Sequence, residues 1–531
     1  MSDEAEIDVA EIDRQMYDRP SRAEKWDLAV KVRLFLYFAL CVAALLTLPN
    51  PFYEPGLAEI TFALGGLGLW RYSWWFNHWV RSEVYARRVY PRMRDEGQKV
   101  WEEGWRPRHL HFMMTTYKEE PEITHRVVGS IIREIRDSGV PATIWLGSSD
   151  RFDEDIIQNF LEANAQDLDL TFRIIRQDVG GKRAAIGIVL RAMNRLPIAK
   201  DDLIIFMDGD FAMEPGCVRF CLPLFKVYPD LHACTTDEEV VVVGPKWILS
   251  WLRMRFAQRR LAMQSHSLSG RVLTLTGRLS VFRAEHLMKR EFIRLLEADF
   301  LDHWLWGKFR FLSGDDKSTW YFLLGQGIRM LYVPDALGYT IEVIEGSGMS
   351  RMVQNFRRWS GNMLRNGRRA IAYGPRRMPF FIWWCLLDQR IAIWTMLVSP
   401  TLVVCAGIVF GWVYVVGYVV FIAITRMLLS MVLYTYSRRV DMMYPWILYL
   451  NQLINASVKV YSLWRLSKQK WSNRGAQSAG FGGDAWVERM RNGMAMFLTS
   501  MSVGMLVLFT LLYTELLHVP ATSTVMFALG L

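Results

Sequence analysis

Long uncharged runs lie near both ends of the chain and frame a central stretch with a different pattern. Residues 34–53 carry no charge over 20 positions, which is enough to cross a hydrocarbon core of about 30 Å. A second apolar run covers residues 57–79, and the short loop between the two runs has acidic but no basic residues. Because basic residues flank both outer ends, the positive-inside rule predicts a transmembrane hairpin with both ends in the cytoplasm.

The C-terminal part is also apolar. Residues 391–425 are uncharged over 35 positions, which is too long for one span, so we predict two spans that meet near residues 411–417. The apolar stretch 442–464 carries polar residues and has basic flanks at both ends, which is typical of a helix lying in the membrane surface. With a second interfacial helix before residue 391 and a last span near the C-terminus, we expect about five spans and two interfacial helices.

Between these segments, short apolar runs alternate with amphipathic stretches. We predict strands at 109–117, 142–147, 170–177, 202–208 and 231–236, and helices at 122–138, 153–164, 182–195 and 216–227. This alternation favours an α/β domain with a mostly parallel, Rossmann-like sheet covered on both faces. Ligands of such sheets bind at the carboxyl ends of the strands.

The predicted organisation places this cytosolic domain between the transmembrane helices. In chain order we expect an acidic cytosolic N-terminal tail (1–27), the transmembrane hairpin (28–80), the α/β domain (81–375), an interfacial helix (376–390), two transmembrane helices (391–437), an interfacial helix with a basic cytosolic loop (442–491), a transmembrane helix (492–518) and a short extracytoplasmic tail (519–531).

Composition narrows the class of protein. The 531 residues are 52% hydrophobic and 22% charged, which excludes a disordered or fibrous chain. The six cysteines form no CxxC or Cys/His pattern, so buried reduced thiols are expected rather than disulfides or a zinc site. The net charge of +10 would favour binding to nucleic acid, to an anionic membrane surface or to an anionic substrate. The cytoplasmic flanks of the membrane segments hold much of this charge, so nucleic acid is not needed to explain it.

Polar residues follow the first three predicted strands. Thr116, Tyr117 and Glu119 come after the first, where a nucleotide base could dock, and Asp150 comes after the second, where it could accept from a base or a ribose hydroxyl. Ordinary loop chemistry explains each of them equally well. After the third strand, two glycines precede Lys182 and Arg183 at a helix start. Backbone amides, helix dipole and cations there favour an anion such as a diphosphate, although a simple glycine-rich turn is the alternative.

The fourth strand ends in Asp208-Gly-Asp210. Carboxylates at the end of a buried strand are hard oxygen ligands suited to Mg²⁺ or Mn²⁺ bridging a diphosphate, and a structural turn is the alternative. Further on, the adjacent Asp315 and Asp316 could supply a general base for sugar transfer, or simply cap a helix. Arg358 and Trp359 combine a phosphate-binding cation with a ring that stacks on sugars. An amphipathic helix at a membrane surface would also show such residues.

The order of DGD, GDD and RRW motifs before paired transmembrane helices resembles the processive membrane glycosyltransferases that make cellulose, hyaluronan, chitin and alginate. Their motif set is D,D,D,(Q/R)xxRW within a GT-A domain. Longer stretches are most similar to the catalytic subunits of bacterial alginate (polymannuronate) synthases, among them RVLTLTGRLSVFRA (271–284), FRFLSGDDKSTW (309–320) and RWSGNMLRNGRRA (358–370). The resemblance covers most of the chain from about residue 30. It departs at Gln354, which is one residue too far from Arg358 and Trp359 for QxxRW.

The resemblance implies a role for each of these residues. Asp150 would contact the nucleoside, Lys182 and Arg183 the base or phosphates, and Asp208 and Asp210 the metal–diphosphate. Asp316 would be the base with Asp315 beside it. Arg358 and Trp359 would hold the diphosphate and the acceptor end.

The implied reaction is inverting transfer of mannuronate from GDP-mannuronate to the 4-hydroxyl of a growing β-1,4 chain, which leaves through an adjoining channel in the bacterial inner membrane. Arg278 and Arg426 are candidates for lining the path of the anionic polymer. Arg426 lies within an apolar span, where a charge usually faces a cavity or partner; snorkelling to a lipid phosphate is the alternative.

Other functions remain open on the sequence. A related synthase could use a UDP-sugar to make a β-glucan or hyaluronan-like chain, and a lipid-linked sugar transferase or a non-catalytic transport subunit is a different class. The chain has no RxxxR…DxSxxG pattern, so cyclic di-GMP control would come through a PilZ-containing co-polymerase, a partner that only the resemblance implies.

Overall fold

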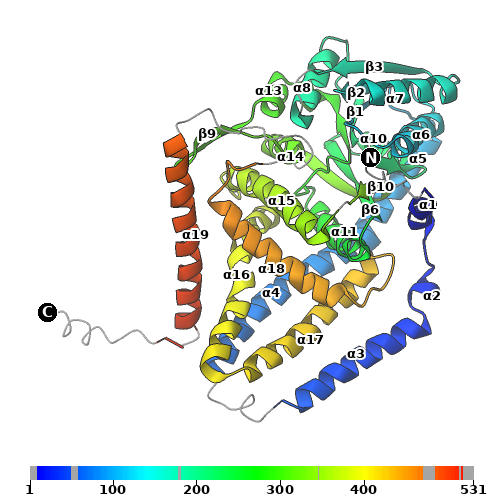
Figure 1. Ribbon diagram of the computed structural model, residues 1–531. Helices are drawn as coiled ribbons and strands as arrows, with labels where there is room; N and C mark the ends of the chain where they lie inside the picture. The colour runs from blue at the N-terminus through cyan, green and yellow to red at the C-terminus, as the bar shows by residue number, and fades with distance from the viewer. Residues whose placement is uncertain are drawn as a thin grey trace, which may run out of the picture.

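The computed structural model describes residues 9–48, 58–177, 181–344, 346–469, 485–513 and 516–517. Most of the predicted hairpin loop, Gly180 before Lys182, most of the basic loop after residue 469 and most of the C-terminal tail lie outside the described residues. An α/β domain occupies one end of the molecule and a group of long helices the other (Figure 1).

The centre of the domain is an eight-stranded sheet of order β3-β2-β1-β4-β7-β6-β10-β5. Strands predicted from the apolar runs form its first half: β1 (Leu110–Thr115), β2 (Ala142–Ser148), β3 (Leu170–Arg176) and β4 (Leu203–Asp208). These four strands pair in parallel, as predicted. Their carboxyl ends therefore meet at one edge of the sheet.

The second half of the sheet differs from the prediction. Its strands are β5 (Phe211–Met213), β6 (Leu231–Val243), β7 (Leu279–Arg283) and β10 (Arg329–Val343). β6 runs well past the predicted end at residue 236. β7 pairs antiparallel with both β4 and β6, and β10 pairs parallel with β6. A separate hairpin joins β8 (Phe300–His303) to β9 (Gly307–Arg310).

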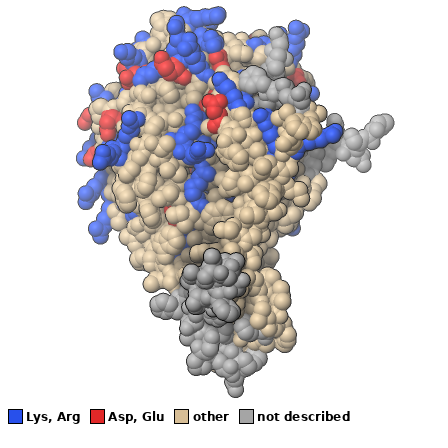
Figure 2. All heavy atoms as spheres, turned by 90° about the vertical axis from the view of Figure 1, so that its left-hand side faces the viewer, with Lys and Arg blue, Asp and Glu red and all other residues tan. Residues whose placement is uncertain are grey.

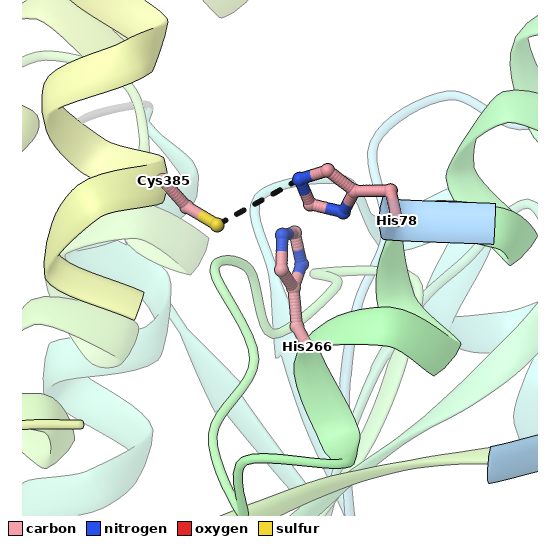
Figure 3. Close-up of side chains that lie close together, drawn as sticks. All are labelled: His78, His266 and Cys385. Atoms are coloured by element: carbon pink, nitrogen blue, oxygen red, sulfur yellow. Dashed lines mark hydrogen bonds between the residues drawn. The ribbon is translucent and has the colours of Figure 1, made fainter. Parts of the chain in front are cut away.

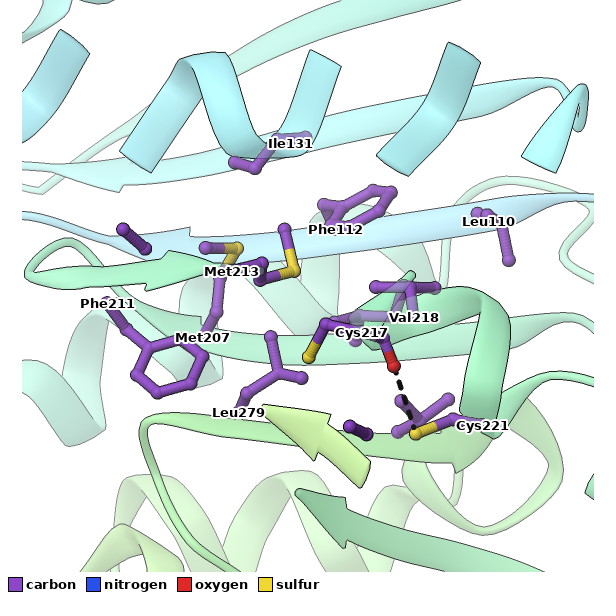
Figure 4. Packing of buried hydrophobic residues seen from close by; sticks show 14 of the residues in the cluster. Leu110, Phe112, Ile131, Met207, Phe211, Met213, Cys217, Val218, Cys221 and Leu279 are labelled. Carbon is purple, nitrogen blue, oxygen red and sulfur yellow. Dashed lines mark hydrogen bonds between the residues drawn. The ribbon is translucent and has the colours of Figure 1, made fainter. Parts of the chain in front are cut away.

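Helices cover both faces of the sheet. Alternating side chains divide between two apolar clusters, with Phe112 in one and Met113 in the other. Figure 4 shows the first cluster, in which Phe112 lies near Ile131 and the buried thiol of Cys217. No described cysteine forms a disulfide. The domain helices are α5 (Tyr90–Glu102), α6 (Pro121–Ser138), α7 (Arg151–Asn164), α8 (Lys182–Met193), α9 (Cys217–Cys221), α10 (Leu224–Val227), α11 (Lys246–Ser267), α12 (Ala284–Leu287), α13 (Arg290–Glu297), α14 (Asp315–Gly325) and α15 (Gly348–Ile371).

Four helices of the described chain are long and apolar enough to cross a membrane. They contain α3 (Leu28–Leu46), α16 (Phe380–Phe410), α17 (Val413–Tyr436) and α19 (Ala485–Tyr513). In Figure 2, charged side chains gather over the end that carries the sheet, and the described residues toward the opposite end are mostly uncharged. The long helices α4 (Ala58–Val84) and α18 (Tyr444–Leu463) are not among the four; the short N-terminal helices are α1 (Val9–Tyr17) and α2 (Arg22–Lys25).

One predicted boundary is wrong. A separate interfacial helix was expected at 376–390, but α16 continues without a break from Phe380. The charges that suggested a boundary have partners instead. Asp388 accepts from Arg71 of α4 at 2.5 Å, and Arg390 donates to the Leu364 carbonyl at 2.5 Å. The junction between α16 and α17 lies at residues 411–412, within the region predicted for it.

A cluster of His78, His266 and Cys385 joins three helices, α4, α11 and α16, at the border between the domain and the long helices (Figure 3). The Cys385 sulfur lies 3.8 Å from Nε2 of His78. The two imidazole rings pack edge to face with centroids 5.4 Å apart. This packing holds the domain against α16.

Candidate active site

The DGD motif lies at the carboxyl end of β4, beside the end of β1. The backbone amide of Gly209 donates to the Thr115 carbonyl at 3.0 Å. A Cβ at position 209 would lie 3.1 Å from both this carbonyl oxygen and the Thr116 side chain. Glycine therefore allows the chain to stay close to β1 while Asp208 and Asp210 leave the strand end on either side of it.

Lys182 joins the DGD and GDD motifs. Its Nζ lies 2.5 Å from Oδ1 of Asp208 and 3.3 Å from Oδ2 of Asp315. These carboxylates, together with Asp316, raise the pKa of Lys182 even though burial opposes the charge. The three predicted elements, Lys182, DGD and GDD, therefore meet at one edge of the sheet.

Asp210 has an unused oxygen. Its Oδ1 is enclosed and has no hydrogen-bond partner among the described residues. Burial, with the nearby charge of Asp208, raises the pKa of Asp210 to about 7, and Arg278 acts against this. A buried carboxylate with an unsatisfied oxygen beside a second carboxylate suits a divalent cation with oxygen ligands. The pair Asp208 and Asp210 fits that chemistry.

The GDD motif starts α14. Gly314 has a φ of +81°, a left-handed conformation that favours glycine. A Cβ there would lie 2.6 Å from the Asn362 side chain of α15, so glycine also permits this close packing. Asp315 is paired with Lys182, whereas burial and the neighbouring Asp315 raise the pKa of Asp316. Asp316 is therefore readier to take a proton than an ordinary aspartate.

A pocket lies between these motifs. Polar lining comes from Lys182, Thr276, Asp315 and Asp316, and apolar lining includes Met113. The backbone of Gly277 passes close to the lysine, since a Cβ there would lie 3.1 Å from Lys182 Nζ. The pocket thus has acids, a cation and an apolar wall at the strand ends where the sequence predicts ligand binding.

Arg358 and Trp359 lie on α15 beside this region. Burial lowers the pKa of Arg358, while Glu342 and Asp316 act in the opposite direction. The Trp359 ring stacks on Trp251 of α11, with centroids 6.0 Å apart and planes 26° from parallel. Arg358 therefore lies near the second acid motif, whereas the Trp359 ring packs against α11.

Arg278 differs from its prediction. It was expected to line the path of the acceptor, but its guanidinium donates to Glu238 at 2.9 Å and to Glu342 at 3.0 Å. Its backbone carbonyl accepts from the Asp208 amide at 3.1 Å. Arg278 therefore supports the acid cluster, with its own charge already neutralised by two glutamates.

Arg183 also differs from its prediction. The residue is 3% exposed, and its guanidinium donates to the carbonyls of Leu295 and Leu296 and to the Ser318 hydroxyl. These contacts turn its donors away from the pocket. Arg183 thus ties α8 to α13 and α14, and its placement gives no support for a role in donor binding.

The predicted nucleoside-binding residues lie at the ends of β1 and β2. Asp150 caps α7, accepting from the Phe152 amide at 2.9 Å. Thr116 donates to Asp153 at 3.2 Å, while Tyr117 and Glu119 lie in the turn before α6. Asp153 is buried and also accepts from the Lys118 amide at 2.8 Å. This acid was not among the predicted residues, although its place three residues into a helix after a strand is a usable signal.

The two glutamates that hold Arg278 were missed as well. Glu238 is 1% exposed and is the middle acid of the run Asp237-Glu238-Glu239, which precedes four valines at the end of β6. Glu342 lies near the end of β10. A carboxylate in an apolar strand signals a buried ion pair, and that signal could have revealed Glu238.

Arg426 is buried in the middle of α17, as its position in an apolar span suggested. It donates to the Tyr72 hydroxyl of α4 at 2.9 Å and lies 5.8 Å from the ring centroid of Tyr449 in α18. Its partners are thus protein hydroxyls and rings from neighbouring helices.

Comparisons with known proteins agree with this geometry. A family described as "Glycosyltransferase like family 2" matches residues 107–362. A protein named "Glycosyltransferase alg8" from Pseudomonas syringae pv. tomato is 34% identical over 440 residues, covering 82% of this chain and 89% of that protein. A protein of the same name from Azotobacter vinelandii is 34% identical over 446 residues, with 83% and 89% covered.

Solved structures show weaker likeness. The mannosyltransferase PcManGT from Pyrobaculum calidifontis, in complex with GDP-Man and Mn²⁺, has 16% identity and a TM-score of 0.44 and covers 76% of this chain and 96% of its own. GalNAc-T7 with UDP, GalNAc and Mn²⁺ has 12% identity and a TM-score of 0.30, covering 45% and 44%.

The family match and the strand order of the sheet identify the domain as a GT-A glycosyltransferase fold, and the long apolar helices make this a membrane protein. The extent of identity with the two relatives settles the family. This chain belongs to the alg8 family, the glycosyltransferases of alginate biosynthesis.

Proposed function

We propose that the protein transfers mannuronate from GDP-mannuronate to the 4-hydroxyl of a growing β-1,4-linked polymannuronate and passes the polymer across the bacterial inner membrane. One observation carries the proposal: Lys182 bridges the DGD and GDD motifs beside a pocket lined by Asp315 and Asp316. Asp316 also lies near enough to Arg358 of α15 for the two charges to interact. Donor, metal and base groups would then share a single site.

A divalent cation, Mg²⁺ or Mn²⁺, would be held by Asp208 and Asp210. The unpartnered Oδ1 of Asp210 and its raised pKa support this role, because metal binding would satisfy a carboxylate that the described residues leave unpaired. When bound, such an ion neutralises charge on the diphosphate of the donor.

Asp316 is the proposed base. It takes the proton of the acceptor 4-hydroxyl as that oxygen forms a bond to the anomeric carbon of the donor. The bond from this carbon to the diphosphate oxygen breaks, and its electron pair leaves with GDP. A single displacement of this kind inverts the anomeric centre. The raised pKa of Asp316 suits a base that must accept a proton near neutral pH.

The remaining predicted residues surround this reaction. Lys182 and Arg358 would stabilise the leaving diphosphate, and Trp359 would stack on the acceptor sugar. Thr116, Tyr117, Glu119 and Asp150 would contact the nucleoside from the ends of β1 and β2.

The membrane helices complete the proposal. The positive-inside rule places the domain in the cytoplasm, and Arg426 would face the polymer carboxylates within the helices. A PilZ-containing subunit that binds cyclic di-GMP is the proposed co-polymerase. A synthase that uses a UDP-sugar is the alternative to this donor assignment.

The test uses membranes that contain the full chain. GDP-mannuronate with Mg²⁺ or Mn²⁺ should yield a polymer that alginate lyase degrades, and UDP-sugars should yield none. The Asp316→Asn variant should make polymer at a rate at least about 100-fold lower. A lyase-resistant product, or polymer formed from a UDP-sugar alone, would overturn the donor assignment. Reconstitution with and without the PilZ subunit tests the partner.

A further inference from the structure

Two cations from neighbouring helices lie near each other, and one of them contacts Trp359 of the RW motif. Arg255 of α11 places its guanidinium carbon 5.2 Å from the ring centroid of Trp359 and 5.7 Å from that of Phe356. Lys459 of α18 lies near enough to Arg255 for the two charges to repel, which contributes to a lowered pKa of Lys459. Each comes from a helix that packs next to α15.

Arg255 has no carboxylate partner among the described residues. Burial alone accounts for its lowered pKa, about 10. Its neighbours on α11 are different: Arg259 is paired with Glu238, and Arg260 with Asp237 and with a second glutamate of β6. Carboxylates of β6 therefore neutralise Arg259 and Arg260, whereas Arg255 faces aromatic rings.

Lys459 is in a similar position. Burial, Arg255 and Arg390 lower its pKa to about 8. The carboxylate that acts in the other direction is Asp388, which is already bonded to Arg71 at 2.5 Å. Two cations close together without a free acid are costly in a poorly solvated place unless an anion joins them.

The side chains around Arg255 and Lys459 suit an anionic sugar. Trp359 stacks on Trp251, which donates to Asn451 of α18 at 2.9 Å. Arg255 and Lys459 are both half-buried, so each keeps surface that a ligand can contact. Aromatic rings with one cation over them and a second cation close by suit a pyranose that carries a carboxylate, because the sugar ring can stack and the carboxylate can pair with the cations.

We infer that Arg255 and Lys459 bind the carboxylates of the acceptor chain as it leaves the reaction site, and so select a uronate polymer over a neutral one. This rests on the proposed function. In this inference Arg255 and Lys459 select the acceptor, whereas the acid motifs and Lys182 act on the donor. The phosphates of GDP share anion chemistry with a uronate, so the test includes both.

Binding measured without donor separates this inference from the donor assignment. Purified full-length protein in detergent is titrated with oligomannuronate, with the same oligosaccharide after carboxyl reduction to mannose, and with GDP. The wild type should prefer the charged oligosaccharide. Arg255→Gln and Lys459→Met should each weaken oligomannuronate binding about tenfold and leave the affinity for the reduced oligosaccharide within about twofold.

Controls define the result further. The matched control is Arg357→Gln, which removes the same charge from an exposed neighbour of Arg358 on α15 and should not change the preference. Arg255→Lys should retain most of it. Equal binding of both oligosaccharides by the wild type, or an unchanged preference in both Arg255→Gln and Lys459→Met, would overturn the inference. So would a loss of GDP affinity that matches the loss for oligomannuronate.

Discussion

The ammonium group of Lys182 lies 2.5 Å from the carboxylate of Asp208, although the two belong to different motifs. The lysine starts α8 and the aspartate ends β4, so parallel strand packing brings them to one edge. One cation thereby limits the repulsion among Asp208, Asp315 and Asp316. In the proposed reaction, the same cation would help to hold the departing diphosphate.

Replacing Lys182 by Met should therefore have two effects. Transfer activity should fall by at least about 100-fold, because a charged contact to the diphosphate is lost. The melting temperature without metal should also fall, because the acids lose their common counter-ion. Polymer synthesis and thermal unfolding in detergent measure the two effects. Lys226→Met, at an exposed site on α10, is the control and should change neither.

Asp210→Asn should abolish activity yet stabilise the metal-free protein at alkaline pH. The fold raises the pKa of Asp210 from 3.8 to about 7. The protonated carboxyl is therefore favoured by folding, and this contribution is complete below about pH 4 and is lost as pH rises through about 7. At pH 8 the variant should melt about 2–4 °C above the wild type, and at pH 4 the difference should vanish. A lower melting temperature at pH 8 would contradict the buried-carboxylate assignment.

Metal binding should depend on the protonation state of Asp210. Mn²⁺ should raise the melting temperature of the wild type at pH 8 and progressively less as pH falls below about 7, because protons compete for Asp210. Thermal shift with a Mn²⁺ titration at several pH values measures this. The Asp210→Asn variant should show little response at any pH, and a full response would place the metal elsewhere.

Steady-state kinetics should distinguish the roles of the two acids of the GDD motif. Asp316→Asn should reduce transfer by about 100-fold or more while the donor KM changes little, because it removes the proposed base. Asp315→Asn should raise the donor KM instead, since Asp315 positions Lys182 at 3.3 Å. As the pH is lowered, the wild-type rate should begin to fall at a pH above the usual pKa of an aspartate. The reason is that Asp316 must be ionised to act and its pKa is raised. The opposite pattern would exchange the two roles.

Arg183 should prove to be a stability residue. Arg183→Gln removes a buried cation from the carbonyls of Leu295 and Leu296 and should lower the melting temperature by about 6 °C. The folded fraction should keep the donor KM of the wild type. A large rise in KM without loss of stability would restore its predicted role in donor binding.

The first half of the sheet could be predicted because β1, β2 and β4 are short, nearly continuous apolar runs between amphipathic helices. β10 could not. It contains Pro334 and Gly338, which are unfavourable inside strands, and its pairing with β6 shifts register between Val333 and Leu337. Tertiary pairing overrides these local preferences.

The motifs could be predicted, but not which way their side chains point. Lys182 and Arg183 are adjacent at the start of α8, and successive residues of a helix differ by about 100° around its axis. One reaches the acids and the other turns to α13 and α14. Likewise, only the fold shows that Glu238 and Glu342 neutralise Arg278, since these residues lie on separate strands.

The close packing of Gly314 against Asn362 has a wider consequence. The glycine opens the helix that carries Asp316, and the asparagine belongs to the helix that carries Trp359. The proposed proton acceptor and the proposed sugar-stacking residue therefore lie on two helices whose close approach requires glycine at position 314. Any side chain at position 314 would push the two helices apart. In the proposed reaction, this would lengthen the distance between the base and the acceptor sugar.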